Sequence, residues 1–355
     1  MKAAIRTRYG GPEQVRIEDI EKPEPGEGQV LVRVHAASVN RADLDYIAPR
    51  PQFIRAFVGV RGPRNPRLGT DVAGTVEAVG PDVTRFTPGD RVFGDLLPFG
   101  MGSFAEFVVA KEKAFLPIPE GIDFDTAATL PHAAVLALQG LRTRAGDTVK
   151  PGDRVLVDGA SGNVGPFAVQ LAKHMGAEVT GVCRTEKVDF VRSLGADRVL
   201  DYRAVDFTKS PERYDWIVAS DSHHPILSVR RALWPGGHYA TLGGGTLDIL
   251  EAMTIGPIAN RAGSRKAGLM LWWKPFHEPD VKTLTDLVLA GTLKPAIHRV
   301  YPLDEVREAL TRVHEGRANG KVLIRVVPAE AAATVPAEQR PRGGAPPEGW
   351  PPDPA

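Results

Sequence analysis

Cysteine is almost absent from this chain, since Cys183 is the single one among 355 residues. One thiol excludes a disulfide within the chain and also a zinc site built from several cysteines. An excess of charge of one sign is equally lacking, because 44 Lys and Arg residues stand against 43 Asp and Glu residues. That balance gives no reason to expect nucleic acid or a charged membrane surface as a partner.

Long apolar segments are missing as well. No run approaches the roughly 20 apolar residues of a membrane-spanning helix. Residues 1–6, Met-Lys-Ala-Ala-Ile-Arg, lack the apolar core of a signal peptide. These absences predict a soluble cytoplasmic protein with neither nucleic-acid nor membrane partners. The length is enough for two domains, and the sequence shows no internal repeat.

The most informative stretch is residues 153–187. A short apolar run at 155–157 predicts a buried strand, a glycine-rich segment follows, and residues 166–175 carry apolar side chains at helical spacing. A second apolar strand comes next, at 178–182. This order is the context of a dinucleotide-binding turn, where glycines let the backbone approach a pyrophosphate at a helix N-terminus. Ala160 replaces the first glycine of the usual G-x-G-x-x-G pattern, so the context supports the prediction more than the pattern does. The predicted contacts of this turn are Ser161, Gly162, Asn163 and Val164.

The end of the second strand indicates which dinucleotide binds. An NAD site places Asp or Glu about 20 residues after the glycines, to hold the ribose 2′-hydroxyl. Here residues 182–187 read Val-Cys-Arg-Thr-Glu-Lys. An acid at the strand tip would repel a 2′-phosphate, whereas Arg184, Thr185 and Lys187 would hold one. We therefore predict NADPH as the cofactor; a solvated cap with ordinary charges is the alternative.

The remaining chain divides into a β-rich part and a part in which strands and helices alternate. Up to residue 120, short strands at 30–34, 72–79 and 104–109 are separated by Pro-Gly and Gly-Asp turns. A helical period begins at residue 125, and the alternation of strands and helices begins at 155. Further helices are expected at 227–233, 281–291 and 304–315, and strands at 214–218, 238–242 and 321–327.

Several segments have more than one interpretation. Residues 46–70 contain Arg50, Arg55 and three further arginines without a carboxylate, which fits a clamp for anionic groups or a solvated loop. Gly243 and Gly244 follow a strand, where a backbone can approach the cofactor or simply turn. The pair Trp272-Trp273 fits a core, a subunit interface or a substrate wall. Residues 46–70 and 246–280 show no readable pattern of secondary structure, and residues 328–355 predict a disordered tail rich in Pro and Ala.

A series of short motifs follows one another in a fixed order. They are Ser-Val-Asn-Arg-Ala-Asp at 38–43, Leu-Gly-Thr-Asp-Val-Ala-Gly at 68–74, Pro-Gly-Asp-Arg-Val at 88–92, Leu-Pro at 130–131, the glycine segment, Leu-Gly-Ala-Asp at 194–197 and Gly-Lys-Val at 320–322. Their order and spacing resemble the medium-chain dehydrogenase/reductase superfamily, specifically its zinc-free quinone oxidoreductase-like branch, over about residues 1–327.

The resemblance implies an α/β fold with two domains. A GroES-like β-rich domain, at 1–124 and 296–327, would carry the substrate and the catalytic residues. A Rossmann domain with a doubly wound parallel sheet, at 125–295, would bind NADPH. The resemblance also implies a homodimer joined through the edges of the Rossmann sheets.

Zinc-dependent relatives have Cys at the position of Asn40, His at that of Thr70, and a cysteine-rich lobe. None of these ligands is present, so we expect no metal. The zinc-free branch moves hydride from NADPH to an activated C=C in an enone or quinone, whose conjugated carbonyl takes up the negative charge. The substrate would be a small molecule with a conjugated carbonyl, and a reductive cyclisation is a variant of the same chemistry. A metal-free carbonyl or alcohol dehydrogenase and a non-enzymatic NADPH-binding protein remain alternatives.

The resemblance also assigns individual residues. Asn40 is similar to the active-site amide of the family and Asp43 to a polar neighbour that orients it, while a capping Asn and a solvated Asp are the plainer interpretations. Tyr46 would donate to the substrate oxygen or simply pack. Further contacts to the 2′-phosphate are expected from Lys187, Tyr202 and Arg317.

Two departures from the family affect the nicotinamide end. Leu136 stands where relatives often carry a Thr that faces the nicotinamide, and residues 219–224, Ala-Ser-Asp-Ser-His-His, replace an Asp and a Gly at a strand end. His132, His223 or His224 could supply a proton near neutral pH. A solvated or capping histidine is the competing interpretation for each.

Overall fold

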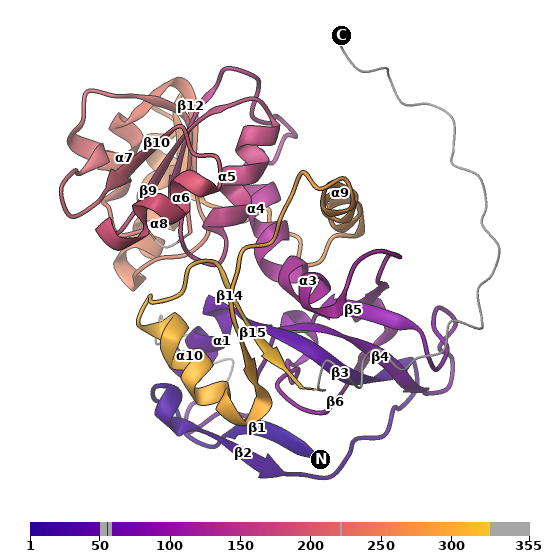
Figure 1. Ribbon diagram of the computed structural model, residues 1–355. Coiled ribbons are helices and arrows are strands. Elements are labelled where there is room, and N and C mark those ends of the chain that lie inside the picture. Colours follow the sequence, from indigo (N-terminus) through magenta and orange to yellow (C-terminus); the bar gives the residue numbers. More distant parts are fainter. Residues whose placement is uncertain (50–54, 56–58, 221, 327–355) are drawn as a thin grey trace.

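The computed structural model describes residues 1–49, 55, 59–220 and 222–326, which form two connected parts (Figure 1). Arg50 and the predicted tail at 328–355 lie outside the described residues. The upper part in Figure 1 is built on a parallel sheet, and the lower part on a mainly antiparallel one. This confirms the predicted α/β class with a Rossmann-type and a GroES-like part. None of the described helices is long and apolar enough to cross a membrane.

Six parallel strands form the first sheet, in the order β10-β9-β8-β11-β12-β13. Counted from β8, this is the order 3-2-1-4-5-6 of a doubly wound sheet, whose connections change direction between β8 and β11. A ligand is therefore expected at the carboxyl ends of these two strands. The strands are β8 (Arg154–Asp158), β9 (Glu178–Cys183), β10 (Arg198–Asp201), β11 (Tyr214–Ala219), β12 (Leu233–Thr241) and β13 (Lys266–Leu269).

Helices cover both faces of this sheet, which explains why β8 is an uninterrupted apolar run. Val155 and Val157 pack in one hydrophobic core with Phe167 of α5, whereas Leu156 packs in another with Val229 of α7. The alternation follows from the period of two along a strand. The helices of this part are α4 (Val135–Gly140), α5 (Gly165–His174), α6 (Val188–Ser193), α7 (Ile226–Arg231), α8 (Thr246–Ala259) and α9 (Glu278–Leu289).

The second sheet joins strands from both ends of the chain, in the order β14-β15-β3-β4-β5-β7, with β6 also paired to β3. Val322 lies opposite Val39 where β15 runs antiparallel to β3. β1 and β2 form a separate antiparallel pair. The strands are β1 (Lys2–Arg6), β2 (Val15–Asp19), β3 (Gln29–Val39), β4 (Asp71–Val79), β5 (Arg91–Asp95), β6 (Phe107–Lys111), β7 (Phe115–Pro117), β14 (Ile297–Pro302) and β15 (Lys321–Arg325).

The helices of the second part are short, because most of its residues belong to strands and turns. They are α1 (Arg41–Ile47), α3 (Phe124–Thr129) and α10 (Val306–His314), and single 3-10 turns at η1 (Pro12–Gln14), η3 (Leu97–Phe99), η4 (Glu112–Ala114) and η8 (Leu303–Glu305). Two further 3-10 turns, η6 (Thr185–Lys187) and η7 (Phe207–Lys209), belong to the first part.

The helical period predicted at 125–141 is interrupted. Between α3 and α4 the chain forms a π-helical stretch, η5 (Leu130–Ala134). Pro131 has no N–H and cannot continue the α-helical bonding pattern there. Such π-stretches are frequent at functional sites, and this one contains the buried His132.

Residues 246–280 are more regular than their sequence indicates, because they form α8 and β13. The helix was not predicted because its own apolar side chains lie on all its sides, so that its sequence lacks an amphipathic period. Pro257 also lies inside the helix. Leu247, Met253 and Ile258 of α8 are all exposed. An apolar surface of this kind matters for assembly.

Candidate active site

The glycine-rich turn joins β8 to α5 and folds closely on itself. Gly159 has a φ of +80°, a left-handed conformation that glycine adopts at no steric cost. A Cβ atom on Gly165 would lie 2.2 Å from the carbonyl oxygen of Gly159. Only glycine fits at Gly165, and the turn leads directly into the first residues of α5. Its backbone can therefore approach a pyrophosphate, as the sequence predicts.

A cavity of about 510 Å³ opens at the carboxyl ends of β8, β9 and β11. This is the place where a doubly wound sheet binds its ligand. Seven of the predicted cofactor contacts line it, namely Ser161, Gly162, Asn163, Val164, Arg184, Lys187 and Tyr202. Sequence reasoning missed Arg41, Asp158, Ser220 and Gly320, which also line it. Asp158 and Ser220 lie at the carboxyl ends of β8 and β11, between which the connections of the sheet change direction. That position would have identified them.

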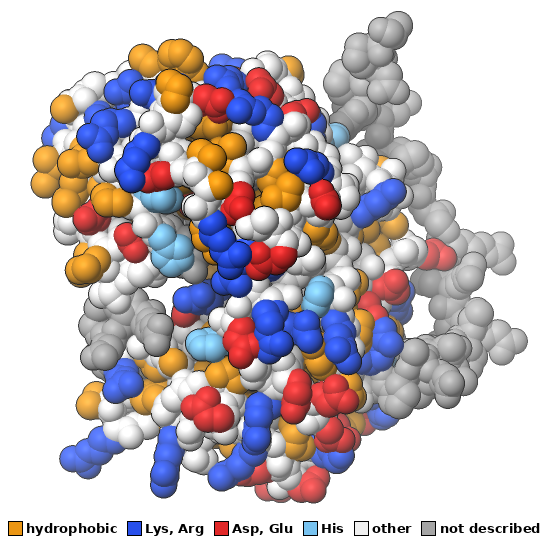
Figure 2. Space-filling view, turned by 60° about the vertical axis from the view of Figure 1, so that its left-hand side comes forward, with side chains coloured by type: hydrophobic (Ala, Val, Ile, Leu, Met, Phe, Trp, Pro, Cys, Tyr) orange, Lys and Arg blue, Asp and Glu red, His pale blue; other side chains and the backbone are white. Residues whose placement is uncertain are grey.

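Three side chains form a cationic group at one end of this cavity. Arg184 donates from Nε to the hydroxyl of Tyr202 at 3.0 Å, and Lys187 donates from Nζ to the carbonyl oxygen of Ala318. Lys187 is 7% exposed, and burial together with the charge of Arg184 lowers the pKa of its ammonium group. Figure 2 shows Lys, Arg and His side chains across the middle of one face, with Asp and Glu side chains between them. The group could bind a phosphate on the ribose.

Four predicted cofactor contacts lie elsewhere. The hydroxyl of Thr185 donates to Asp201 at 2.5 Å. Arg317 forms an ion pair with Glu315 and lines a separate cavity of about 310 Å³ beside α10. Gly243 and Gly244 lie against Ser222, whose N–H donates to the carbonyl oxygen of Gly243 at 3.1 Å. None of these four lines the cavity at the glycine turn.

The glycine turn also contacts the second part of the molecule. Asn163 donates from Nδ2 to the carbonyl oxygen of Val39 at 3.1 Å, and the N–H of Gly320 donates to the carbonyl oxygen of Ser161 at 3.0 Å. Val39 immediately precedes Asn40, and Gly320 immediately precedes Lys321. The glycine turn therefore lies close to these two residues.

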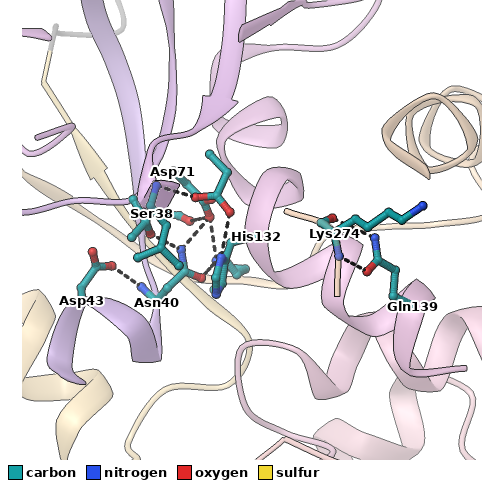
Figure 3. A network of polar contacts seen from close by, with 11 residues as sticks. Ser38, Asn40, Asp43, Asp71, His132, Gln139 and Lys274 are labelled. Carbon is teal, nitrogen blue, oxygen red and sulfur yellow. Dashed lines mark hydrogen bonds and ion pairs between the residues drawn. The ribbon is translucent and has the colours of Figure 1, made fainter. Parts of the chain in front are cut away.

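Asn40 is the centre of a buried polar network (Figure 3). Its amide nitrogen donates to Thr70 Oγ1 at 2.9 Å and to Asp71 Oδ2 at 2.8 Å, while its oxygen accepts from Lys321 Nζ at 2.6 Å. Ser38 also donates to Asp71 Oδ2, at 2.6 Å. Both amide hydrogens of Asn40 are thus already donated. In this arrangement its amide stabilises the network and has no hydrogen left for a substrate.

The two charged members of the network are completely enclosed. Lys321 and Asp71 are both 0% exposed, and Nζ lies 3.4 Å from Asp71 Oδ2. Burial raises the pKa of Asp71 and lowers that of Lys321, and in each case the charge of the partner opposes this shift. Asp71 Oδ1 is buried without a hydrogen-bond partner. Removing either charge would leave the other uncompensated in the interior, which costs about 3–5 kcal/mol.

Asp43 and Tyr46 lie on α1 next to this network. Asp43 Oδ2 accepts from the N–H of Asn40 at 2.7 Å, and Oδ1 is buried without a partner. Burial raises the pKa of Asp43 to about 7, and the negative charge of Asp71 adds to this, although the bond from Asn40 opposes it. Tyr46 is half-buried, and burial also raises the pKa of its phenol. Asp43 thus orients the Asn40 backbone rather than its amide.

His132 and Asp95 form a further buried pair. The ring nitrogen Nδ1 of His132 lies 2.9 Å from Asp95 Oδ2, and Asp95 Oδ1 accepts from the N–H of Leu97 at 2.9 Å. His132 is therefore neither a solvated nor a capping residue. Burial alone would lower the pKa of His132, but the charges of Asp95 and Asp71 outweigh burial and raise it. Sequence reasoning named His132 but could not identify its partner.

The aromatic segment after β13 is anchored next to this pair. Gln139 of α4 accepts from the N–H of Lys274 at 2.9 Å, donates to Asp280 at 2.7 Å, and accepts through its carbonyl oxygen from Trp272 at 3.3 Å. Figure 3 shows the Gln139–Lys274 contact beside the Asn40 network. The ring of Trp273 meets that of His132 edge-on, with centroids 5.4 Å apart. Trp273 therefore covers the histidine pair.

The other histidines proposed as proton sources line the cavity. His224 lies edge-on against Phe207, and burial lowers the pKa of its ring. His223 is more exposed than His224. Leu136, one turn after His132, is the one side chain of α4 that is not buried. Leu136 thus lies on the exposed side of α4, whereas His132, on η5, is buried.

Comparisons with known proteins agree with this arrangement. Residues 26–120 match the family described as alcohol dehydrogenase GroES-like domain, and residues 194–324 match the family described as zinc-binding dehydrogenase. The human mitochondrial NAD(P)H oxidoreductase RTN4IP1 is 33% identical over 92% of this chain and 89% of its own length. The tomato (Solanum lycopersicum) 2-methylene-furan-3-one reductase is 31% identical over 92% and 80%.

Among solved structures, the quinone oxidoreductase from Coxiella burnetii superposes with a TM-score of 0.82. It is 29% identical and covers 92% of this chain and 99% of its own. The chain belongs to the medium-chain dehydrogenase/reductase superfamily, among its quinone oxidoreductase-like members, which form an NAD(P)H-dependent oxidoreductase family.

The raised pKa of Asp43 makes stability depend on pH. From its ordinary value of 3.8 up to about 7, this carboxyl is ionised in the unfolded chain but protonated in the folded one. The folded state thus binds the extra proton, and its stability falls as the pH rises through this window. Asp43→Asn should therefore gain stability relative to the wild type as the pH rises. We expect its free energy of unfolding, minus that of the wild type, to increase by about 2 kcal/mol between about pH 5 and about pH 8.

Urea titration of both proteins at the two pH values measures this difference. Asp45→Asn, on the same helix but partly exposed beside Arg41, is the matched control, and its pH dependence should follow the wild type. An Asp43→Asn variant that keeps the pH dependence of the wild type would show that Asp43 is ionised in the folded protein.

Proposed function

We propose that this protein is an NADPH-dependent, zinc-independent reductase of an activated C=C in an enone or a quinone. The observation that carries the proposal is that the glycine turn bonds to Val39 and Gly320, the chain neighbours of Asn40 and Lys321 in the buried network. Amide and hydroxyl groups of Asn40 and Thr70 stand where zinc-dependent relatives have ligands, and both are bonded to other side chains. Such groups do not suit a zinc ion, which prefers thiolate, imidazole and carboxylate ligands.

The cavity suits NADPH. Ser161, Gly162, Asn163 and Val164 would face the pyrophosphate at the start of α5. Arg184, Lys187 and Tyr202 would hold the 2′-phosphate, and no carboxylate of the second strand's tip lines the cavity to oppose it. NADPH supplies a hydride from its nicotinamide ring. We also retain Thr185, Gly243, Gly244 and Arg317 as weaker candidates, since each would need a different side-chain or loop position.

An enone or quinone needs little acid to accept a hydride. Its own conjugated carbonyl spreads the developing negative charge, so the protein must position the acceptor, exclude water and donate a hydrogen bond to the oxygen. Tyr46 is one candidate donor, Asp43 positions the Asn40 backbone, and Trp273 helps to close the site. The names of the compared proteins support this class, since one is a quinone oxidoreductase and the other a 2-methylene-furan-3-one reductase.

A reductive cyclisation remains a variant of the same chemistry. After hydride addition, the enolate carbon would attack a second electrophilic carbon of the same substrate. The first step and the residues are unchanged, so the two reactions differ only in the substrate.

Removing the predicted phosphate contact should change cofactor preference. We expect wild type to bind NADPH at least about tenfold more tightly than NADH, which is about 1.4 kcal/mol. Lys187→Ala should lose most of that preference, because its ammonium group would pair with the 2′-phosphate. Titration of cofactor fluorescence measures both affinities. Arg203→Ala is the control, since Arg203 lies near the same strand tip but pairs with Glu186 outside the cavity. Equal affinities for both cofactors in the wild type would refute the assignment.

The reaction class can be tested with simple acceptors. We expect 2-cyclohexen-1-one or 1,4-benzoquinone to be reduced with a kcat/KM at least about a hundredfold above that of propanal, or about 2.7 kcal/mol. Loss of NADPH absorbance gives the rates, and mass spectrometry identifies the product. Faster reduction of propanal would favour the carbonyl or alcohol dehydrogenase. Tight NADPH binding without turnover of any acceptor would favour a non-enzymatic binding protein.

We also propose a homodimer, formed around α8 and the edge strand β13. An edge strand offers unpaired backbone groups, and the surrounding surface is unusually apolar. Figure 2 shows hydrophobic side chains gathered at the upper left, over the part built on the parallel sheet. Exposed apolar residues here are Leu247, Leu250, Met253, Ile258 and Leu271.

Charge placed on this surface should separate the subunits. We expect wild type to sediment at twice the 38.2 kDa of one chain, and Ile258→Glu with Leu271→Glu to sediment as a monomer, because two buried carboxylates per subunit would be unpaired. Val205→Glu, also at an exposed apolar residue but outside this surface, is the control. A monomeric wild type in analytical ultracentrifugation would contradict the proposal.

A further inference from the structure

We propose that His132, held by Asp95, donates the proton that the acceptor's oxygen takes up during reduction. This inference rests on the proposed function and adds the proton donor to it. It starts from the buried pair formed by these two side chains at the junction of η5 and β5.

The pair fixes which nitrogen of the histidine is available. A carboxylate only accepts hydrogen bonds, so the contact of 2.9 Å with Asp95 keeps the hydrogen of His132 on Nδ1. The bond from the N–H of Leu97 to the other oxygen of Asp95 holds the carboxylate in place. Nε2 makes no hydrogen bond to any residue that the structure describes, and His132 is 8% exposed while Asp95 is 0% exposed. Nε2 is thus the nitrogen left to meet a ligand.

His132 lies beside the polar network whose flanking residues the glycine turn contacts. The glycine turn bonds to Val39 and Gly320, next to Asn40 and Lys321. Asn40 and Lys321 both bond to Asp71. Figure 3 shows His132 beside Asp71 and Asn40. Leu136, one turn along, is partly exposed.

The predicted amide donor is already engaged. Both hydrogens of the Asn40 side chain bond to Thr70 and Asp71, so a substrate oxygen would have to displace one of these bonds inside a closed network. Replacing a bond to a buried carboxylate leaves that charge undersatisfied. His132 requires no such exchange, because its Nε2–H is not shared with another residue.

The surroundings of His132 suit a proton transfer. Trp273 covers one edge of the ring, and Phe276 of the same segment packs edge-on against Phe93, two residues before Asp95. Gln139 anchors this segment to α4. The aromatic cover limits the access of water, and a charge-assisted hydrogen bond is stronger in such a place.

The step balances as follows. The acceptor gains a hydride from the reduced nicotinamide, at the β-carbon of an enone or at the ring of a quinone, and its π electron pair moves onto the oxygen. The Nε2–H bond of imidazolium His132 breaks as the O–H bond forms. An enol results, and a neutral imidazole remains bonded to Asp95. From a quinone this enol is a hydroxydienone, whose sp3 ring carbon then loses a proton to solvent while its remaining carbonyl oxygen gains one, which gives the hydroquinone. Solvent returns the proton to Nε2 before the next turnover.

Several charged groups face His132. They are Asp95 on β5, Asp71 on β4, Asp43 on α1 and Lys321 on β15. On the helices packed against η5, Asp280 of α9 is held by Arg142, and Lys173 of α5 by Asp197. Burial and the charge of Lys321 lower the pKa of His132, but the carboxylates outweigh them and raise it above the ordinary value of an imidazole.

The pH dependence of kcat for 1,4-benzoquinone or 2-cyclohexen-1-one tests the role. In the wild type kcat should fall as the pH rises through the pKa of His132. His132→Gln should lose this decline. Its kcat should also fall by at least about tenfold, since a general acid usually contributes about a hundredfold or more to the rate. Asp95→Asn should keep the decline but move it to lower pH, because the charge that holds the imidazolium is gone. If His132 and Asp95 had only a structural role, these substitutions would change neither the pH at which kcat declines nor the shape of the decline.

A ligand that resembles the intermediate gives a second readout without turnover. The anion of 4-nitrophenol carries its charge on an oxygen conjugated to a ring, and its absorbance reports its ionisation. We expect it to bind the NADP⁺-saturated wild type as the anion, and His132→Gln to bind it at least about tenfold more weakly, about 1.4 kcal/mol. His35→Gln is the control, a similarly buried histidine that bonds to Thr75 and stacks on Phe124.

Circular dichroism of each variant checks folding, and Asp95→Asn keeps the test decisive should His132→Gln fail to fold. If the pH decline and the affinity for 4-nitrophenol survive in His132→Gln, the pair is only structural and the inference is overturned. If Tyr46→Phe removes both instead, Tyr46 is the donor and the inference is likewise overturned. A wild type that reduces neither acceptor overturns the proposed function, and with it the proton role, whatever the result with 4-nitrophenol.

Discussion

The buried pair of Lys321 and Asp71 is the contact on which the arrangement of this molecule depends. An ammonium and a carboxylate with no exposed surface are tolerated only when they bond to each other and to further polar groups. Lys321 comes from the last described strand, Asp71 from β4 and Asn40 from the end of β3. Satisfying one ammonium group therefore requires the C-terminal strand to return beside β3. The same return places Gly320 against the glycine turn and so joins the two sheets.

The same network also limits which side chains are free to bind a substrate. Bonds within the network occupy the side-chain amide of Asn40, and Asp71 accepts three such bonds. Residues inside it are thus bound to one another, and a substrate must find its partners at the edge of the network. The edge is formed by α1 with Tyr46, by η5 with His132, and by the segment that carries Trp273. The network holds its own members in place, and under the proposed function the reacting groups would be side chains that still have an open hydrogen-bonding position.

The sequence alone predicts the features whose residues lie close together along the chain. A glycine turn between an apolar strand and an amphipathic helix can be read from 35 residues, and the cationic strand tip follows at a fixed distance. Arg184 and Lys187 line the cavity, although Thr185 turns to Asp201, an acid on the neighbouring strand that no local pattern reveals. Arg317 was assigned by resemblance, but Glu315, two residues earlier, holds it. Helix α8 was not predicted because apolar residues on all its sides hide the helical period.

The nicotinamide end could not be derived in the same way, for a physical reason. His132 and Asp95 are separated by 37 residues and meet only because η5 packs against the end of β5. Neither residue indicates a buried pair in the sequence alone, and the proton role that we propose for His132 depends on both. A dinucleotide is bound largely by backbone groups of one turn, whereas a hydride acceptor is bound by side chains from several elements. Sequence patterns therefore identify the cofactor before the substrate, and the proton donor only after the tertiary contacts are known.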